Sequence, residues 1–362
     1  MRIDIHTPIT FQELGSRDKQ EDTVFPAPGG GTSSDRIFVL CDGMGGHEEG
    51  EVASKTVCDA IVSHVKAHWQ EDKPLPDAVL TKAVEKACNA IDSLYDGKSK
   101  ELGTTLTIVA LHAGGCTALH IGDSRIYHLR TSEQRWAYIS RDHSLVFDLY
   151  QSGEISYEEM RTSTRRNIIT KAIMAGKEGH PRPDIVHIGD IQPDDCFFLC
   201  SDGMLEQLDD EELLQLLCAK VSDQEKAKTL VKQTKDNKDN HSAHIIRIKQ
   251  VLVKPGEKVA DDERTTRCNA LNVKPRIHEV DKGVKPVVGE NAKTMVSARS
   301  TKGTALARCL PSWWIWLVLA IVALAVALFF AFSKHDKEKE QDPPSSETIE
   351  IHTISHGTKQ NK

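Results

Sequence analysis

The sequence lacks the cysteine spacings that indicate a zinc site or a redox-active disulfide. Its nine cysteines are scattered, and no two of them form a C-x-x-C pair. We therefore predict reduced thiols, mostly packed in a core, and a reducing compartment. The opening stretch, "MRIDIHTPITFQEL", contains no basic region followed by an apolar block, so it does not resemble a secretion signal. Its alternation of polar and apolar residues predicts a first strand instead. No internal repeat is evident.

One long apolar run is present towards the end of the sequence. Residues 313–332, "WWIWLVLAIVALAVALFFAF", carry no charge. A helix of that length rises about 30 Å, the thickness of a bilayer core, and the tryptophans at one end suit a membrane interface. A buried core helix is the alternative, but the polar tail that follows would not cover it. We predict a transmembrane helix at 312–332.

Composition divides the rest of the chain. Residues 252–311 show no helical or strand period and carry more lysine and arginine than aspartate and glutamate. They predict a basic juxtamembrane linker, which either lies near an anionic membrane leaflet or is simply solvated. Residues 333–362 contain "DPPSSE" and few apolar residues, so we predict a short polar, disordered tail. Residues 1–251 are then the folded domain of a chain whose net charge is −7.

Apolar periodicity in the folded domain predicts both strands and helices. Strand-like runs occupy 37–41, 104–111, 116–121, 125–129, 184–188, 196–200 and 243–248. Helical periodicity occupies 51–69, 76–95 and 209–219. Because short turns separate the strands around 104–129, these strands are expected to pair antiparallel. Long helices among such strands indicate a two-layered or four-layered α/β sandwich.

Acidic residues lie beside small or polar residues at five strand ends or turns. These are Glu21-Asp22, Asp42-Gly43, Gly122-Asp123-Ser124, Ser201-Asp202-Gly203 and Asp239-Asn240. A single Asp-Gly pair normally marks a turn, and an aspartate after a strand is a common helix cap. Five together favour converging carboxylates, which Mg²⁺ or Mn²⁺ would stabilise, because these hard cations take oxygen ligands. Zinc fits less well, since candidate Cys/His clusters are few.

The stretch "VLCDGMGGHEEG" indicates how such a site is built. The strand fixes Asp42, and Gly43 leaves its own carbonyl open to approach. The carboxylate and this carbonyl are then both able to reach metal ions. Two ions about 3.5–4 Å apart activate a water and stabilise an in-line displacement at phosphorus.

Seven short motifs follow the order and spacing of one known family. They are "GSRDKQED", "DGMGGH", "GTT", "GDSR", "DHS", "SDG" and "DN", between about residues 8 and 250. On these motifs the chain resembles the protein phosphatase 2C family, the metal-dependent PPM-type Ser/Thr phosphatases, and in particular its bacterial branch. The resemblance implies an α+β fold, a four-layered α/β/β/α sandwich with two central antiparallel β-sheets flanked by helices.

The resemblance also implies a set of metal ligands. Asp42 would bridge two Mn²⁺ or Mg²⁺ ions, and the Gly43 carbonyl would bind one of them. Asp202 and Asp239 would hold the other. Asp123, together with Asp202, would bind a third, weaker ion.

Three further roles are implied around these ligands. Glu21 would belong to the metal site largely through water, and Asp22 would orient a water. Arg17 would grip the substrate phosphate, a task suited to the fork of a guanidinium group. The catalytic residues implied are therefore Arg17, Asp22 and Asp42. A water activated between the ions, not a side chain, would be the nucleophile.

After "DN" the chain departs from the family pattern. The family continues with an apolar residue and then Thr or Ser, whereas this chain has "HS", and Asp236-Asn237 just upstream offers a rival ligand pair. We prefer Asp239, because the strand at 243–248 must follow.

The segment 150–176 resembles the mobile flap of bacterial members. It has "TST" where those members often have His-Pro before "RRNIIT". Arg165 and Arg166 would either recruit phosphopeptides or simply solvate the surface. His143, in "DHS", is expected to order a strand-to-helix turn, and His47 is expected to pack or hydrogen-bond below the site more than to act in catalysis.

Together these observations predict a membrane-anchored, Mn²⁺/Mg²⁺-dependent protein serine/threonine phosphatase, a phosphoric monoester hydrolase. Its expected partners are phosphorylated Ser/Thr proteins, including a cognate bacterial kinase, and not nucleic acid. The catalytic domain is expected on the cytoplasmic side of the inner membrane, where phosphoproteins and reduced thiols occur. The alternatives are an inactive phosphoprotein-binding scaffold, a phosphatase for small phosphate esters, and a membrane sensor that acts through its tail.

Overall fold

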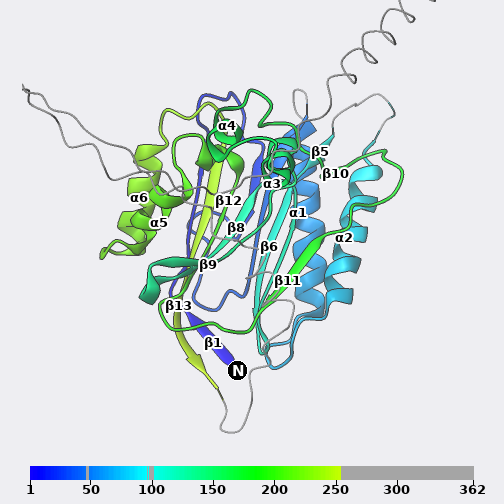
Figure 1. Ribbon diagram of the computed structural model, residues 1–362. Coiled ribbons are helices and arrows are strands. Elements are labelled where there is room, and N and C mark those ends of the chain that lie inside the picture. Colours follow the sequence, from blue (N-terminus) through cyan, green and yellow to red (C-terminus); the bar gives the residue numbers. More distant parts are fainter. Residues whose placement is uncertain (46–48, 96, 98–101, 254–362) are drawn as a thin grey trace, which may run out of the picture. The chain divides into compact units, whose positions relative to one another are not determined.

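The computed structural model of the chain describes residues 1–45, 49–95, 97 and 102–253. In this part of the chain the strands form two antiparallel sheets, and helices cover their outer faces (Figure 1). All the described residues belong to the unit Met1–Lys282. The prediction of two antiparallel sheets flanked by helices is confirmed.

The first sheet packs against two long helices. Its strands are β3 (Asp22–Phe25), β4 (Ile37–Met44), β5 (Gly103–Thr104), β6 (Leu106–His112), β7 (Gly115–Ile121), β10 (Ile173–Met174) and β11 (Asp184–Ile188). They run in the order β10-β5-β4-β6-β7-β11, with β3 paired to β4. The helices α1 (Glu49–His68) and α2 (Asp77–Asp92) bury Val57, Ile61 and Leu80 against this sheet.

The second sheet carries a shorter pair of helices. Its strands are β1 (Arg2–Ile5), β2 (Ile9–Glu13), β8 (Arg125–Arg130), β9 (Arg135–Ile139), β12 (Cys196–Cys200) and β13 (His241–Leu252). They run in the order β1-β13-β12-β8-β9, with β2 paired to β13. The helices α5 (Asp210–Cys218) and α6 (Asp223–Gln233) bury Leu213 and Leu230 against its outer face.

Strand periodicity explains why the apolar runs are continuous. In β12, Phe197 and Leu199 face the core between the two sheets, whereas Phe198 faces α5 and α6. In β4, Phe38 faces the other sheet and Val39 faces α1 and α2. Since successive side chains point to opposite faces and both faces are covered, nearly every position of these strands is apolar.

The remaining elements are short turns and helices between the strands. Short 3₁₀ turns occupy Thr131–Glu133 and Asp202–Leu205. Two short helices, α3 (Leu145–Ser152) and α4 (Tyr157–Thr162), lie between β9 and β10, within and just before the segment that resembles a flap. The side chain of Ser144 caps α3, so the "DHS" motif does precede a helix, as expected of His143.

Two of the predicted strands are subdivided. The predicted strand 104–111 divides into β5 and β6 at Thr105, which bonds to Asp42 instead of continuing the ladder. The predicted first strand is two strands, β1 and β2, on either side of Pro8, and both pair with β13.

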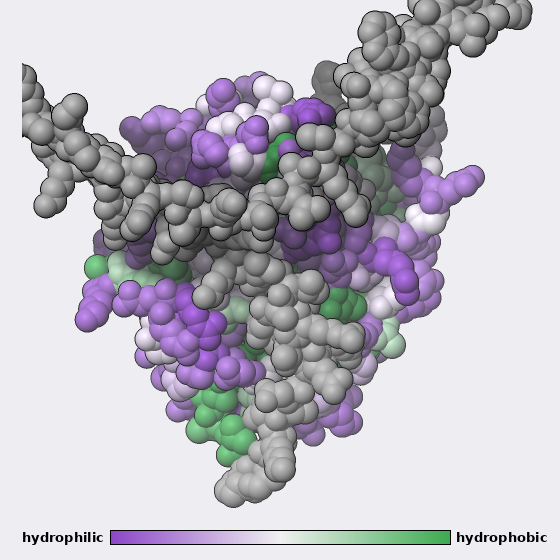
Figure 2. Space-filling view, in the orientation of Figure 1, coloured by the Kyte–Doolittle hydropathy of each residue, from purple (hydrophilic) through white to green (hydrophobic). Residues whose placement is uncertain are grey.

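The predicted transmembrane helix at 312–332 and the tail at 333–362 lie outside the described residues, as does the linker at 252–311 except for its first two positions. Within the described ranges no helix is long and apolar enough to cross a bilayer. The coloured surface in Figure 2 is largely hydrophilic, with small separate apolar areas. The proposed domain boundaries therefore remain predictions.

Candidate metal centre

Five acidic segments that are distant in the sequence meet at one end of the two sheets. The burial of Asp42 and the carboxylates around it raise the pKa of Asp42 well above its usual value. After burial, the contributing carboxylates are, in decreasing order, those of Asp22, Asp202, Asp123 and Asp239. The convergence that the strand-end pattern predicted is therefore present.

Asp22 and Asp42 lie directly opposite each other on neighbouring strands. They form a cross-strand pair between β3 and β4, and like charges in such a position destabilise a sheet. Hydrogen bonds fix the main chain of Asp42 nonetheless. The Thr104 hydroxyl and the Thr105 amide each donate to the Asp42 carbonyl at 2.8 Å, and the Asp42 amide donates to the Thr105 hydroxyl at 3.0 Å.

Thr104 and Thr105 belong to the "GTT" motif, but the sequence indicated only a structural role for them, because β-branched residues favour strands. The structure assigns them to the bridge between β5 and the carboxyl end of β4. They hold the Asp42 backbone at a position where the acidic side chains repel each other.

Gly43 is required by close packing. A Cβ atom there would lie 2.1 Å from the Gly50 carbonyl oxygen and 2.5 Å from that of Glu21. The Gly43 amide donates to the Glu21 carbonyl at 3.1 Å. The absence of a side chain thus brings the start of α1 and the Glu21 segment against the end of β4.

The buried carboxylates have raised pKa values. Burial first, and then neighbouring acids, raise the pKa of Asp22 to about 7 and that of Asp202 to about 6. Burial and then Asp202 raise the pKa of Asp123 well above its usual value. One buried oxygen of Asp22 and one of Asp123 have no hydrogen-bond donor. Oxygen-rich, cation-deficient surroundings of this kind fit a hard divalent metal ion.

The structure distinguishes between Asp236 and Asp239, the two candidate metal ligands that precede β13. Asp239 contributes to the raised pKa values of Asp42, Asp22 and Asp202, so it lies with the acidic cluster. Asp236 is 80% exposed at its side chain and pairs with Lys235. The preference for Asp239 as the ligand therefore agrees with the geometry.

Arg17 lies at the mouth of the cluster. Its guanidinium donates to the Asp239 carboxylate at 2.7 Å and lies 3.8 Å from that of Glu21. The Arg17 side chain is 49% exposed, so one side of it faces solvent. This position suits a group that receives an incoming phosphate beside metal ligands.

Two residues that the sequence interpretation gave no role complete the frame. Asn240 accepts from the Glu21 amide at 2.7 Å and donates to the carbonyls of Leu14 and Lys19, so it shapes the loop that carries Arg17. The Ser201 hydroxyl donates to the Asp22 carboxylate at 2.8 Å. In the sequence, the only indication of Asn240 and Ser201 was their position beside an acidic residue in the motifs "DN" and "SDG".

A cavity of about 120 Å³ adjoins the carboxylates. Asp123, Asp202 and Asp239 line one part of it, and residues of α4, among them Tyr157 and Met160, line another. Arg166 also lines this cavity and pairs with Glu206 at 2.8 Å. Both Arg165 and Arg166 are exposed to solvent. His47 lies outside the described residues.

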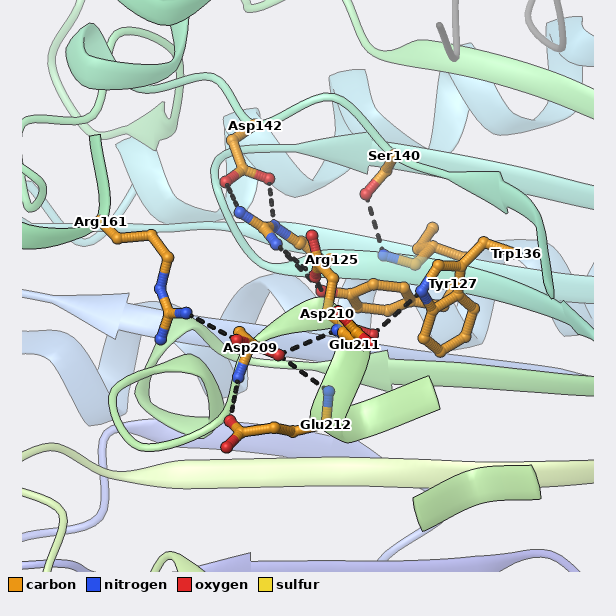
Figure 3. Close-up of polar contacts among 11 residues, drawn as sticks. Arg125, Tyr127, Trp136, Ser140, Asp142, Arg161, Asp209, Asp210, Glu211 and Glu212 are labelled. Carbon is orange, nitrogen blue, oxygen red and sulfur yellow. Dashed lines mark hydrogen bonds and ion pairs between the residues drawn. The ribbon is translucent and has the colours of Figure 1, made fainter. Parts of the chain in front are cut away.

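A buried ion-pair network supports the same cavity (Figure 3). The Arg125 guanidinium donates to both oxygens of Asp142 at 2.7 Å and to Asp210 at 3.0 Å. Asp210 also accepts from the Tyr127 hydroxyl at 2.8 Å. The "R" of "GDSR" therefore joins β8 to the start of α5 and to the loop before α3, which fixes the wall of the cavity.

Comparison with known proteins identifies the family. The sequence profile described as Protein phosphatase 2C matches residues 20–237. The chain belongs to the protein phosphatase 2C family. Among its relatives, the serine/threonine phosphatase Stp of Listeria innocua is 29% identical, over 61% of this chain and 86% of that protein.

PstP of Mycobacterium tuberculosis is a second relative in the protein phosphatase 2C family. It is 33% identical over 56% of this chain, a region that spans 36% of PstP. The crystal structure of a PstP catalytic domain in complex with two manganese ions covers 68% of this chain and all of that chain, with a TM-score of 0.55 and 28% identity.

Proposed function

We infer that the protein is a metal-dependent protein serine/threonine phosphatase of the PPM class. The observation that carries this conclusion is the convergence of buried carboxylates from five segments on one point at the end of both sheets. Membership of the protein phosphatase 2C family gives the reaction, hydrolysis of phosphoserine and phosphothreonine in proteins. Phosphoproteins, among them a cognate kinase, are the proposed substrates.

The acidic residues divide into ligands and supporting groups. Asp42, the Gly43 carbonyl, Asp202 and Asp239 are the proposed ligands of two Mn²⁺ or Mg²⁺ ions. Asp123 is the proposed ligand, with Asp202, of a third and weaker ion. Bound divalent ions would supply Lewis acidity that activates water and neutralises charge on the phosphate.

The protein's own side chains orient the reactants. Arg17 presents its exposed face to the phosphate and is held by Asp239. Asp22, fixed by the Ser201 hydroxyl, has its other oxygen buried without a donor, and this oxygen is the proposed acceptor for a water proton. Glu21 lies next to Arg17 and supports the ligands from further out.

The function is tested by steady-state kinetics of Arg17→Ala. The purified chain with Mn²⁺ is expected to release phosphate from phosphoserine and phosphothreonine peptides. Arg17→Ala is expected to raise KM about tenfold with little change in kcat, because loss of a charge-assisted hydrogen bond costs about 1.5–3 kcal/mol in both ground and transition states.

Arg135→Ala is the matched control for this experiment. Arg135 is similarly exposed, at 53%, and also pairs with a glutamate, but it lies on β9. A chain that binds Mn²⁺ yet releases no phosphate from any phosphopeptide would contradict the proposed function. Higher kcat/KM on small phosphate esters than on every phosphopeptide would favour the alternative substrate class.

We further propose that the protein is anchored by a transmembrane helix at 312–332, with residues 1–311 in the cytoplasm and 333–362 across the membrane. The support is the charge-free run at 313–332 and the absence of paired cysteine spacings. The linker at 252–311 would let the active site reach phosphoproteins near the membrane.

Protease added to intact spheroplasts is expected to remove only the C-terminal tail from this membrane-bound protein. Detergent-permeabilised spheroplasts provide the control, in which the catalytic domain becomes accessible. Digestion of the catalytic domain in sealed spheroplasts would reverse the proposed orientation, and recovery of the whole chain in the soluble fraction would exclude the anchor.

A further inference from the structure

A second polar cluster lies directly behind the Gly122–Asp123 turn. His120, His143 and Asp184 offer ligand-type atoms that all lie within 4.8 Å of one another. Asp184 faces His120 across the β7–β11 pair, and the rings of His120 and His143 are stacked, with centroids 4.7 Å apart. Nothing in the proposed phosphatase chemistry uses these residues directly.

The hydrogen bonds show that this cluster is not arranged as a metal site. The Gly122 amide donates to His143 Nδ1 at 3.0 Å, so the lone pair of this nitrogen is already engaged and does not point to an ion. Lys171 Nζ lies 3.0 Å from His143 Nε2 and 2.9 Å from Asp184 Oδ1, in the position that an ion would take. The two stacked rings differ in plane by only 7°, so their in-plane lone pairs cannot converge on one ion.

The cluster instead fixes the turn that carries Asp123. The His143 amide donates to the Gly122 carbonyl at 3.0 Å, and the Gly122 amide returns a bond to the His143 ring. Gly122 has φ of +109°, a conformation that other residues rarely adopt, so this turn depends on outside support. His143 Nε2 is in turn 3.3 Å from Asp184 Oδ2.

The same cluster joins the two ends of the α3–α4 segment, which we define as residues 144–171. The segment starts immediately after His143 and ends at Lys171. The Thr170 amide donates to the His143 carbonyl at 2.8 Å, and the Leu145 amide donates to the Ile168 carbonyl at 2.9 Å. One oxygen of Asp184 faces His143 and the other binds Lys171, so a single carboxylate holds both ends.

The charges favour this arrangement. Hydrogen bonds from His143 and Lys171 hold the pKa of Asp184 well below its usual range, against the effect of partial burial. Burial, and then the nearby His143, lower the pKa of His120 to about 4, so its ring is neutral and serves as a stacking surface. The His120 Nε2 proton is donated to the Arg141 carbonyl, which fixes the ring at the start of the same loop.

We propose that Asp184 is a positioning residue that couples the α3–α4 segment to the metal centre, by fixing the base of the segment through Lys171 and the Gly122–Asp123 turn through His143. The inference rests on the proposed function in one respect, because it takes Asp123 as an ion ligand. The α3–α4 segment lines the cavity beside the carboxylates, so its placement and ion occupancy at Asp123 become linked. Linkage is reciprocal, and ion binding at Asp123 therefore orders the segment.

The test is Mn²⁺ titration calorimetry and amide hydrogen exchange on the full chain, in the wild type, Asp184→Ala and Asp148→Asn. The wild type is expected to bind a tight class of ions and a weaker one. Asp184→Ala is expected to weaken only the weaker class, by about tenfold, the range seen for groups that orient metal ligands. Saturating Mn²⁺ is expected to slow exchange in residues 145–170 of the wild type but not of Asp184→Ala.

Asp148→Asn is the matched control. Asp148 lies on α3 inside the segment, has 45% side-chain exposure against 43% for Asp184, and also pairs with a cation, Arg141, at 2.7 Å. It is expected to retain wild-type ion binding and protection. Lys171→Met, which keeps the Asp184–His143 contact, is expected to lose the Mn²⁺-dependent protection while weakening the ion less than Asp184→Ala does.

Three results would overturn the inference. The first is an unchanged affinity of the weaker Mn²⁺ class in Asp184→Ala. The second is the absence of any weaker Mn²⁺ class in the wild type. The third is that Asp184→Ala and Lys171→Met each lose the tight and the weaker Mn²⁺ class to the same extent. In the third case the cluster would be a general structural support only. The proposed function fails separately, through absence of the tight class or of phosphopeptide turnover in the wild type, neither of which depends on Asp184.

Discussion

Chelation of divalent ions by EDTA is expected to abolish turnover of phosphopeptides, with a fall in kcat of at least about a thousandfold and recovery on addition of excess Mn²⁺. The ion-free chain keeps Arg17 to bind phosphate, but it has no divalent ion to activate water and to neutralise charge on the phosphate. Loss of several kcal/mol of transition-state stabilisation corresponds to about this factor, at about 1.36 kcal/mol for each tenfold.

The same carboxylates predict how pH affects the ion-free protein. The folded-state pKa values of Asp22 and Asp202, about 7 and about 6, are above the ordinary value of 3.8. At pH values between 3.8 and about 7, the folded chain binds more protons than the unfolded chain. The free energy of unfolding of the ion-free protein therefore falls as the pH rises through this range. Bound Mn²⁺ would replace those protons and reduce the repulsion between the carboxylates.

Thermal unfolding measures this effect. The increase in Tm on addition of Mn²⁺ is expected to be larger at pH 7.5 than at pH 5.5, because at the lower pH the ion must displace bound protons. Mg²⁺ serves as a second ion and EDTA alone as the baseline. Full activity in excess chelator, or a Tm increase that is larger at pH 5.5, would contradict the assignment of this cluster as the metal centre.

Asp42→Asn is expected to lower kcat by about a thousandfold, corresponding to about 4 kcal/mol, and to reduce the number of tightly bound Mn²⁺ ions. Asp42 is the proposed bridge between two ions, and it sits among four other acids. An asparagine of the same shape keeps one oxygen but removes the negative charge that would attract both ions.

The variant should behave differently without metal. Because the cross-strand Asp22–Asp42 pair repels, the ion-free Asp42→Asn protein is expected to have a higher Tm at pH 7.5 than the ion-free wild type. A loss of activity through misfolding would instead lower Tm. Kinetics, Mn²⁺ calorimetry and thermal unfolding together therefore separate a ligand from a structural residue.

Asp59→Asn provides the control on α1. Its side chain is 69% exposed and pairs with Lys55, four residues earlier on the helix. This change is expected to leave kcat, ion number and Tm close to those of the wild type, as surface pairs contribute little. Near-normal kcat in Asp42→Asn would show that Asp42 does not bridge the ions.

Four elements, α3, α4, α6 and β3, were not predicted from periodicity, because their sequences carry only a weak helical or strand pattern. α3 and α4 are short, and α6 "DQEKAKTLVKQ" buries Ala227 and Leu230 in an otherwise polar sequence, so none of the three has a strong helical period. β3 has four residues, and its pairing with β4, not its own sequence, makes it a strand. Tertiary contacts supplied the stability that local propensity did not.

The sequence by itself determined the two-faced strands and the residue types at their ends. Continuous apolar runs such as "CFFLC" and "IFVLC" specify strands buried on both faces, because the pattern is local and repeats every second residue. An aspartate followed by a glycine at the end of such a run is likewise a local feature. These signals were sufficient to predict antiparallel strands, helices packed on them and converging carboxylates, whereas the arrangement in two central sheets followed from the family resemblance.

Only the tertiary structure decided how those ends meet. It placed Asp22 opposite Asp42, brought Asp239 to the centre while leaving Asp236 in solvent, and gave Thr105 the task of holding the Asp42 backbone. It also placed Asp184, a residue without any motif, between the two ends of the α3–α4 segment. Strand register and sheet-on-sheet packing set these neighbours, and both depend on contacts between residues far apart in the chain, which no local pattern encodes.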